Sequence, residues 1–297
     1  MHNEILLTGV TGFIGSHLCK RLVNDGNHVI GISHSGNTQR IEAIKDKITL
    51  YIGDIRNSEF INDIFKQHQI KTVFHLAAQV PYCTDDKDFV GINVDGTLNV
   101  VKASIANKVE RFIHASTMSI YTIPPAYLPV DELHPTAPRD IYGITKLAGE
   151  LCLKHVPMKV TILRFAGAYG EYCDNRAVDI FVRSALANQP IKIDGDGLQS
   201  SDFTHVDDIV NGIILAWQRG KETVYNIGSG QGTRIKDLVD AILKMTNSKS
   251  TVNFVSNQVE RPFKFELDIS KARKELGYQP HTLKDGIKKY IEAVKRG

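Results

Sequence analysis

The sequence has little of what marks disulfide-bonded or metal-binding proteins. Among its 297 residues are only four cysteines, Cys19, Cys83, Cys152 and Cys173, which lie far apart and show no paired spacing. We therefore expect free thiols in a reducing compartment, with neither a disulfide framework nor a zinc site. The eleven histidines are also scattered without metal-ligand spacing, so no metal is predicted.

Long apolar runs and a surplus of charge are missing as well. No segment approaches the ~18 apolar residues of a membrane span, and a strand-like run begins at once, which argues against a signal peptide. The net charge is only +3, and no run of like charges forms a tail, so nucleic acid is not an expected partner. The sequence predicts a soluble, cytoplasmic protein with a substantial core.

Strand-like and helix-like segments alternate through residues 1–165. The strand candidates are residues 4–8, 28–32, 48–52, 72–76, 111–115 and 159–163. Helical patterns fall between them, near residues 13–25, 58–68, 94–107 and 140–155. This alternation predicts an α/β fold built on a doubly wound parallel sheet, the Rossmann architecture.

The pattern is more mixed over residues 166–297. Helices are expected near 177–188, 206–218, 233–245 and 282–294, and short strands near 191–193 and 224–227. We interpret this part as a smaller mixed α/β substrate lobe with interleaved segments. It would pack over the carboxyl edge of the sheet, where ligands of such sheets bind.

A glycine-rich turn joins the first expected strand to the first expected helix. The turn contains Gly9, Thr11, Gly12, Phe13, Ile14 and Gly15. Glycines here permit a tight turn and bring backbone N–H groups close to a pyrophosphate, and the helix N-terminus adds a favourable dipole. A turn that merely needs positive φ is the alternative, but the strand–turn–helix context favours dinucleotide binding.

A tyrosine and a lysine stand four residues apart on an expected helix. Tyr142 and Lys146 therefore share one helix face. A lysine ammonium stabilises a nearby phenolate and lowers a tyrosine pKa from about 10. Such a tyrosine exchanges a proton with a substrate oxygen, and Thr117 could hydrogen-bond that oxygen. Together they suit the interconversion of an alcohol and a carbonyl, although the pair taken alone favours an ordinary helix surface, and it is the N-terminal glycine turn that reverses this interpretation.

Taken with the glycine turn, these motifs resemble the extended short-chain dehydrogenases/reductases, and within them the nucleotide-sugar epimerases, dehydratases and ketoreductases. The similarity runs nearly end to end and includes residues 73–78, 93–99, 112–117, 195–199, 202–208 and 276–280. It implies that Tyr142 is the general acid/base, that Lys146 also holds the cofactor ribose, and that Thr117, rather than its neighbour Ser116, binds the reacting oxygen. It also implies a homodimer formed by the helices near 94–107 and 140–155.

The resemblance implies further cofactor contacts, among them Asp54 at the adenine. Simple strand packing is the alternative for Ala77 and Ala78. The residues expected to contact the cofactor are Gly9, Thr11, Gly12, Phe13, Ile14, Gly15, Ser33, His34, Ser35, Arg40, Asp54, Ile55, Leu76, Ala77, Ala78, Asn93, Tyr142 and Lys146.

One departure from the family concerns the choice of cofactor. The family commonly has an acidic residue at the end of the second strand, where this chain has Ser33, His34 and Ser35, with Arg40 a little further on. A carboxylate would repel a 2′-phosphate, whereas these residues could bind it. NADP is therefore favoured, and NAD is left open. A solvated loop charge is the alternative for Arg40.

Other departures concern the reaction and the substrate. Met118 and Ser119 follow Thr117, where the family's dehydratases carry Asp-Glu, so dehydration and decarboxylation are disfavoured. Gly167 and Ser201 replace a usual Asn and Arg. The residues expected to contact the substrate are Thr117, Met118, Arg176 and Arg261.

The first hypothesis is an NADP-linked reductase of a 4-keto-6-deoxy nucleotide sugar, linked to UDP or dTDP. A nucleotide-sugar 4-epimerase that holds NAD tightly is the alternative. A reductase of a small ketone and a non-catalytic dinucleotide-binding protein are further candidates, although Thr117, Tyr142 and Lys146 argue against the last of these.

Overall fold

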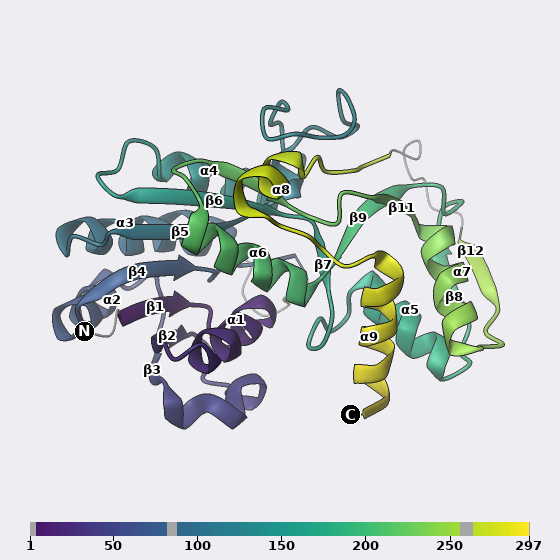
Figure 1. Ribbon diagram of the computed structural model, residues 1–297, viewed down its shortest axis with the longest axis horizontal. Coiled ribbons are helices and arrows are strands. Elements are labelled where there is room, and N and C mark those ends of the chain that lie inside the picture. Colours follow the sequence, from purple (N-terminus) through teal and green to yellow (C-terminus); the bar gives the residue numbers. More distant parts are fainter. Residues whose placement is uncertain (1–3, 82–87, 256–263, 297) are drawn as a thin grey trace.

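A parallel sheet forms the centre of the molecule. The computed structural model describes residues 4–81, 88–255 and 264–296, and within these ranges seven strands pair in the order β10-β6-β5-β4-β1-β2-β3, all parallel (Figure 1). The strands are β1 (Glu4–Thr8), β2 (His28–Ser33), β3 (Thr49–Ile52), β4 (Ile70–His75), β5 (Arg111–Thr117), β6 (Lys159–Phe165) and β10 (Val224–Ile227). The predicted α/β Rossmann architecture is confirmed.

Helices cover both faces of this sheet. One face carries α1 (Phe13–Asn24) and α6 (Val206–Arg219), and the other carries α2 (Ser58–Gln67), α3 (Thr97–Ala106) and α4 (Ile141–Cys152). Successive side chains of a strand point to opposite faces. Accordingly, Ile5 and Leu7 belong to the apolar cluster on the α1 side, whereas Leu6 belongs to the one on the α2 side. Burial on both faces explains why the strands read as continuous apolar runs.

Short helices and two small sheets complete the chain. The short helices are the 3₁₀ helices η1 (Gln39–Lys47) and η3 (Met118–Ile120) and the π-helix η2 (Gly91–Gly96). The small sheets are β11-β9-β7, from Gly232–Arg234, Ser200–His205 and Gly167–Tyr169, and β12-β8, from Val252–Val255 and Ile191–Asp194. The remaining helices are α5 (Ala177–Leu186), α7 (Ile235–Thr246), α8 (Ser270–Leu276) and α9 (Leu283–Arg296).

Strand β10 differs from the sequence-based expectation, which placed residues 224–227 in the smaller lobe. It lies instead beside β6 in the main sheet, with Val224 opposite Ile162 and Ile227 opposite Phe165. Helix α6 carries the chain back across the sheet, as a parallel connection requires. The pattern of a short apolar strand does not reveal which sheet it joins. The expected division of the chain near residue 165 stays a prediction.

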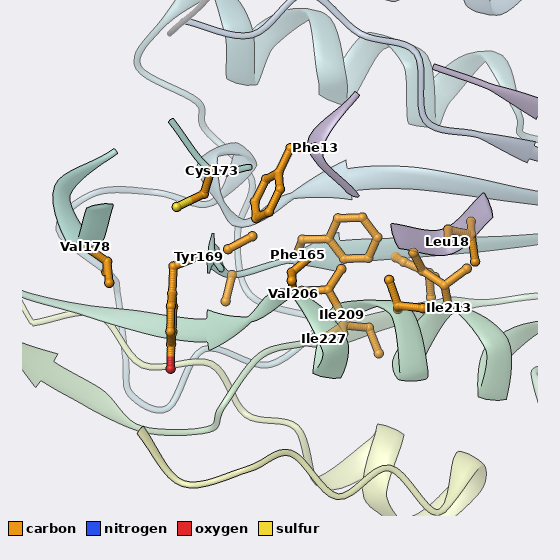
Figure 2. Packing of buried hydrophobic residues seen from close by; sticks show 14 of the residues in the cluster. Phe13, Leu18, Phe165, Tyr169, Cys173, Val178, Val206, Ile209, Ile213 and Ile227 are labelled. Atoms are coloured by element: carbon orange, nitrogen blue, oxygen red, sulfur yellow. The ribbon is translucent and has the colours of Figure 1, made fainter. Parts of the chain in front are cut away.

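One apolar cluster runs from the main sheet into the smaller C-terminal part. Figure 2 shows it passing from Leu18 and Ile213, through Phe165, to Tyr169 and Val178. This continuous packing holds the smaller part against the carboxyl ends of the strands. In the described part of the chain, none of the helices combines the length and the apolar character needed to span a membrane.

Candidate active site

A cavity of about 690 Å³ opens at the carboxyl ends of β1, β4, β5 and β6. It brings the glycine turn together with Thr117, Tyr142 and Lys146. Among the described residues, those that line it and were predicted to contact cofactor or substrate are Gly9, Gly12, Phe13, Ile14, Gly15, Arg40, Leu76, Ala78, Thr117, Met118, Tyr142, Lys146 and Arg176.

The glycine turn has the geometry expected of a phosphate cradle. Gly9 has φ of +72°, and a Cβ there would lie 2.9 Å from the Ala77 nitrogen. A Cβ on Gly15 would collide with the Gly9 carbonyl oxygen. Gly12 is the N-cap of α1 and no side chain caps this end, so the first N–H groups of the helix remain for a ligand. The residues of the turn therefore fit a dinucleotide pyrophosphate.

A buried chain of hydrogen bonds fixes the strand ends beneath this turn. Thr8 Oγ1 accepts from the backbone nitrogens of Leu76 and Ala77 at 3.2 and 3.1 Å, so its hydroxyl donates to His75 Nδ1 at 2.9 Å. His75 Nε2 then donates to Thr97 Oγ1, 2.9 Å away. Burial lowers the pKa of His75 to about 3, which keeps the ring neutral, as this pattern requires.

A close helix contact brings Tyr142 and Thr117 to one cavity. Thr117 ends β5, and its Oγ1 accepts from the Ser119 backbone nitrogen at 3.2 Å. Asp140 caps α4 by accepting from the Gly143 nitrogen at 2.7 Å. A Cβ on Gly143 would lie 2.5 Å from the Ser119 carbonyl oxygen, so glycine allows the start of α4 to pack against the turn after Thr117.

The long connection between Thr117 and Tyr142 is anchored by the C-terminal part of the chain. The Val130 nitrogen donates to the Glu266 carbonyl oxygen and the Asp268 nitrogen donates to the Val130 carbonyl oxygen, both at 2.8 Å. Asn226, on β10, donates from Nδ2 to the carbonyl oxygens of Val130 and Asp268 at 2.9 and 3.1 Å.

Lys146 is buried, with 3% of its surface exposed, yet it lines the cavity. Burial lowers its pKa to about 8, although the Glu150 carboxylate acts in the opposite direction. His75 and His114 stack 5.6 Å apart beneath it, and burial also lowers the pKa of His114. Both rings are neutral at physiological pH, so the ammonium is the cation that faces the cavity from this layer.

Ser116, the neighbour of Thr117, is committed to another partner. Its Oγ donates to Glu150 Oε1, and Glu150 is paired with Arg164 on β6. Thr117 lines the same cavity, and its Oγ1 donates to Ser119 Oγ at 3.2 Å rather than to a buried carboxylate. That Thr117, rather than Ser116, meets a substrate oxygen stays a prediction.

The residues at the end of β2 already have protein partners. Ser33 is 1% exposed, and its Oγ lies 2.7 Å from Thr11 Oγ1. Arg40 Nη2 donates to Asp174 Oδ2 at 2.8 Å. Thr11, Ser35 and Arg40 face a second cavity that adjoins the first.

The other predicted cofactor residues lie outside the lining of the cavity. Asp54 accepts from Arg56, whose hydrogen bonds outweigh the effect of burial and hold the Asp54 pKa below its ordinary value. His34 Nε2 is 3.7 Å from Asp54 Oδ2. Ile55 packs against Gly96.

Asn93 and Ala77 act as supports in this structure. Asn93 accepts from the Gln79 nitrogen at 2.7 Å and donates to Thr145 Oγ1 at 3.0 Å, which ties the segment after β4 to α4. Ala77 lies against Gly9, where a larger residue would crowd the turn.

The substrate end of the cavity contains Met118 and Arg176. The Arg176 guanidinium lies 5.1 Å from the centre of the Phe13 ring, so it reaches across to the glycine turn. Arg183, on α5, pairs with Asp179 at 2.5 Å. Arg261 lies outside the described residues.

Several lining residues were not among those predicted to contact cofactor or substrate. They are Val80, Pro81, Ala115, Ser116, Ser119, Asp140, Phe165, Ala166, Gly167, Ala168, Tyr172, Cys173, Asp174 and Asn175. Asp140 could have been predicted from the sequence, because an Asp just before a helical pattern indicates an N-cap. Tyr172 and Asp174 could not, because they come from the segment after β7.

Comparison with known proteins agrees with this geometry. Residues 5–228 match the NAD dependent epimerase/dehydratase family. The UDP-glucose 4-epimerase of Mycolicibacterium smegmatis is 32% identical, over 97% of this chain and 97% of that protein.

Two solved structures are similar over 99% of this chain and 99% of their own. UDP-glucose 4-epimerase from Thermotoga maritima, solved with UDP-glucose, has a TM-score of 0.91 and 30% identity. UDP-glucuronic acid 4-epimerase from Bacillus cereus, solved with UDP-glucuronic acid and NAD, has a TM-score of 0.86 and 32% identity.

Proposed function

Because this chain belongs to the NAD dependent epimerase/dehydratase family, we propose that it is a nucleotide-sugar 4-epimerase that uses NAD. One observation carries the proposal: Thr117, Tyr142 and Lys146 line the same cavity as the glycine turn, and Met118 and Ser119 follow Thr117 where a dehydratase has two carboxylates. The full-length similarity to two 4-epimerases that bind UDP-sugars supports it.

Tyr142 is the proposed acid and base. Its phenolate accepts the proton of the sugar C4 hydroxyl as that carbon is oxidised, and returns it to the same oxygen when the carbon is reduced. Thr117 hydrogen-bonds this oxygen in both directions, and the Lys146 ammonium stabilises the phenolate. NAD, when bound, supplies reversible hydride exchange with C4. The hydride would return to the opposite face of C4 and the proton to the same oxygen, so the sugar would change configuration at C4 without net redox change.

A UDP-hexose is the proposed substrate. Arg176 lies at the cavity wall beside Phe13 and would pair with the diphosphate. Gly167, where the family often has Asn, leaves the wall without a side chain, and a Cβ there would lie 3.0 Å from the Asp202 carbonyl oxygen. The sugar would then be held mainly from the Thr117 side.

The purified protein should be incubated separately with UDP-glucose and UDP-glucuronate. We expect one of them to reach equilibrium with its C4 epimer without stoichiometric consumption of nicotinamide, and a deuterium at C4 to be retained in the product. NMR of the H4 signal measures both. Formation of one NADH per sugar, or no epimer from either sugar, would reject the epimerase.

A second candidate is the NADP-linked 4-keto reductase, which Ser33 favours because it replaces the usual acidic residue. The contacts at the end of β2 weaken this candidate. Ser33 is buried against Thr11, and Arg40 is paired with Asp174, so neither group is set aside for a phosphate. A 4-keto sugar offered with NADPH tests it directly.

We also propose a homodimer formed by α3 and α4. Ile144 and Leu151 on α4 are 49% and 51% exposed, which is unusual for large apolar side chains. Val101, on α3, is buried in the chain's own core and does not contribute to this face. The cytoplasmic location stays a prediction.

A further inference from the structure

A second cavity, of about 560 Å³, lies beside the end of β2. Thr11 and Ser35 line it, so it adjoins the place where a carboxylate of the family would meet the adenosine ribose. It shares Arg40, Tyr172 and Asp174 with the cavity that contains Tyr142. A nucleotide seated on the glycine turn would therefore present its adenosine ribose to these three residues.

Arg40 is held in place on two sides. Its Nη2 lies 2.8 Å from Asp174 Oδ2, and its guanidinium lies 5.8 Å from the centre of the Tyr172 ring. Arg40 belongs to η1, the next element after β2, whereas Asp174 belongs to the segment between β7 and α5. A carboxylate from the C-terminal part thus reaches the end of β2.

The backbone around Asp174 is shaped to present it there. Tyr172 and Asn175 have φ of +70° and +62°, in the left-handed region that non-glycine residues seldom adopt. The Glu171 carbonyl oxygen lies 2.9 Å from His17 Nε2 on α1. Lys20, also on α1, donates to the Tyr172 hydroxyl at 3.3 Å. Helix α1 therefore fixes the segment against the nucleotide-binding side.

The charges that line this cavity do not favour a phosphate. Two are basic, Arg40 and Arg183, and two are acidic, Glu171 and Asp174. Arg183 is engaged by Asp179 at 2.5 Å, and Lys20 lies against the Tyr172 ring. A 2′-phosphate carries a charge of about −1.5 to −2 at neutral pH. A 2′-phosphate would meet no surplus of positive charge in this cavity. Its nearest candidate partner, Arg40, is already paired with the Asp174 carboxylate.

We propose that Asp174 selects NAD over NADP by holding Arg40 and supplying, from the C-terminal part of the chain, the carboxylate that the end of β2 lacks. The inference rests on the proposed function insofar as the cavity binds a nicotinamide dinucleotide. It explains how a chain with Ser33 in place of an acidic residue keeps a preference for NAD. The Asp174 carboxylate, in the segment between β7 and α5, thereby replaces the acidic residue that the family has at the end of β2.

Competition between the two cofactors tests the inference without knowledge of the sugar. Wild-type protein and variants are incubated with an equimolar excess of NAD⁺ and NADP⁺ until the bound fraction is constant, then gel-filtered. The nucleotides are released with acid and quantified by mass. We expect wild type to hold NAD⁺ over NADP⁺ by at least about tenfold, and Asp174→Asn to shift the ratio toward NADP⁺ by about tenfold, the scale of one charged hydrogen bond.

Two matched variants distinguish an effect of the Arg40–Asp174 pair from a general effect of negative charge in the cavity. Glu171→Gln removes the other acid of the same cavity and should move the ratio less than threefold. Arg40→Gln combined with Asp174→Asn should lose the gain in NADP⁺, because the freed guanidinium provides it. An unchanged ratio in Asp174→Asn, or a wild type that prefers NADP⁺, would overturn the inference.

The same samples are assayed for C4 epimerisation of UDP-sugars. Retained NAD⁺ with an unchanged ratio in Asp174→Asn rejects the role of Asp174 alone. Absence of both nucleotides from wild type, or absence of epimerisation, rejects the proposed function.

Discussion

The guanidinium of Arg164 holds both oxygens of the Glu150 carboxylate inside the protein. Nη2 lies 2.8 Å from Oε2 and Nε lies 3.1 Å from Oε1, with both side chains almost fully buried. Glu150 stands one helical turn after Lys146 and accepts from Ser116, so the pair joins β6 to the wall of the active site.

Removing one partner of this pair should be far worse than removing both. Arg164→Met leaves the Glu150 carboxylate buried without its cation, and we expect a loss of about 3–5 kcal/mol in the free energy of unfolding. Arg164→Met combined with Glu150→Gln should be more stable than Arg164→Met alone. Urea unfolding at pH 7 measures both. A double variant no more stable than the single one would show that the charge of Glu150 is not the cause.

Tyr142→Phe should reduce turnover at least a hundredfold, on the scale of about 10²–10⁴ for a general acid/base, and leave cofactor affinity within a fewfold. The reason is that the phenol exchanges the proton, whereas the cofactor is held largely elsewhere. Tyr127→Phe is the matched control, because Tyr127 is exposed and its hydroxyl bonds only Asp131 among the described residues. Near-normal turnover in Tyr142→Phe would reject its assignment.

Lys146→Met should abolish turnover yet stabilise the fold at pH 7. Burial lowers the Lys146 pKa to about 8 from 10.5, so the folded state binds its proton less readily than the unfolded state. Below pH 8 both states are protonated and the full penalty applies, about 1.36 kcal/mol for each pKa unit. Between pH 8 and 10.5 the folded state loses the proton first, so the wild type gains stability as pH rises.

The advantage of Lys146→Met, about 3.4 kcal/mol at pH 7 by that measure, should therefore shrink between pH 8 and pH 10. Urea unfolding of both proteins across this range measures it. A constant difference would mean that the ammonium does not titrate in this window.

His114→Leu should stabilise the protein by about 1 kcal/mol at pH 7. Neither ring nitrogen of His114 has a hydrogen-bond partner among the described residues, so an apolar side chain of similar size removes an unsatisfied group. The gain should grow as pH falls from 7 to 5. The pKa of His114 lies well below 6.5 in the folded state, so acid protonates the unfolded state first and favours unfolding.

His75→Leu is the matched comparison, since His75 stacks on His114 but is bonded at both nitrogens to Thr8 and Thr97. His75→Leu should lower the free energy of unfolding by about 1–3 kcal/mol, because the buried Thr8 and Thr97 hydroxyls each lose a hydrogen-bond partner. Thermal unfolding of the two variants should move in opposite directions, and equal shifts would contradict the argument.

Leu151→Glu should convert the proposed dimer into a monomer, because it places a charge in the apolar face of α4. Leu133→Glu serves as the control, since Leu133 is 89% exposed on the connection between Thr117 and Tyr142. Light scattering at micromolar concentration gives the mass of each protein. A monomeric wild type would reject the dimer.

What could be read from the sequence was local. The glycine turn and the Tyr142–Lys146 pair depend on neighbouring residues in one strand–turn–helix or one helical turn, and the structure brings both to the same cavity. The parallel sheet follows from alternating apolar runs, whose burial on both faces the structure confirms.

What could not be read depends on partners distant in the chain. Asp174 reaches Arg40 across 134 positions, and Asn226 reaches Val130 across 96. Ser33 and Arg40 suggested a phosphate site because the sequence near them does not reveal their partners. Ser33 is hydrogen-bonded to Thr11, and Arg40 is paired with the Asp174 carboxylate. Asn93 likewise carries the family pattern, yet its side chain ties Gln79 to Thr145.

The anchoring of Val130 by residues 266–268 sets an order for biosynthesis. A ribosome releases the N-terminal sheet first, but β6 lacks its outer neighbour until residue 227 has emerged, and the Thr117–Tyr142 connection lacks its anchor until residue 268 has emerged. Until then the nascent chain exposes a strand edge that can pair with other chains. Translation pauses or premature stops before residue 268 should therefore yield aggregation-prone chains without a formed catalytic centre, and chaperone demand should fall once that point is passed.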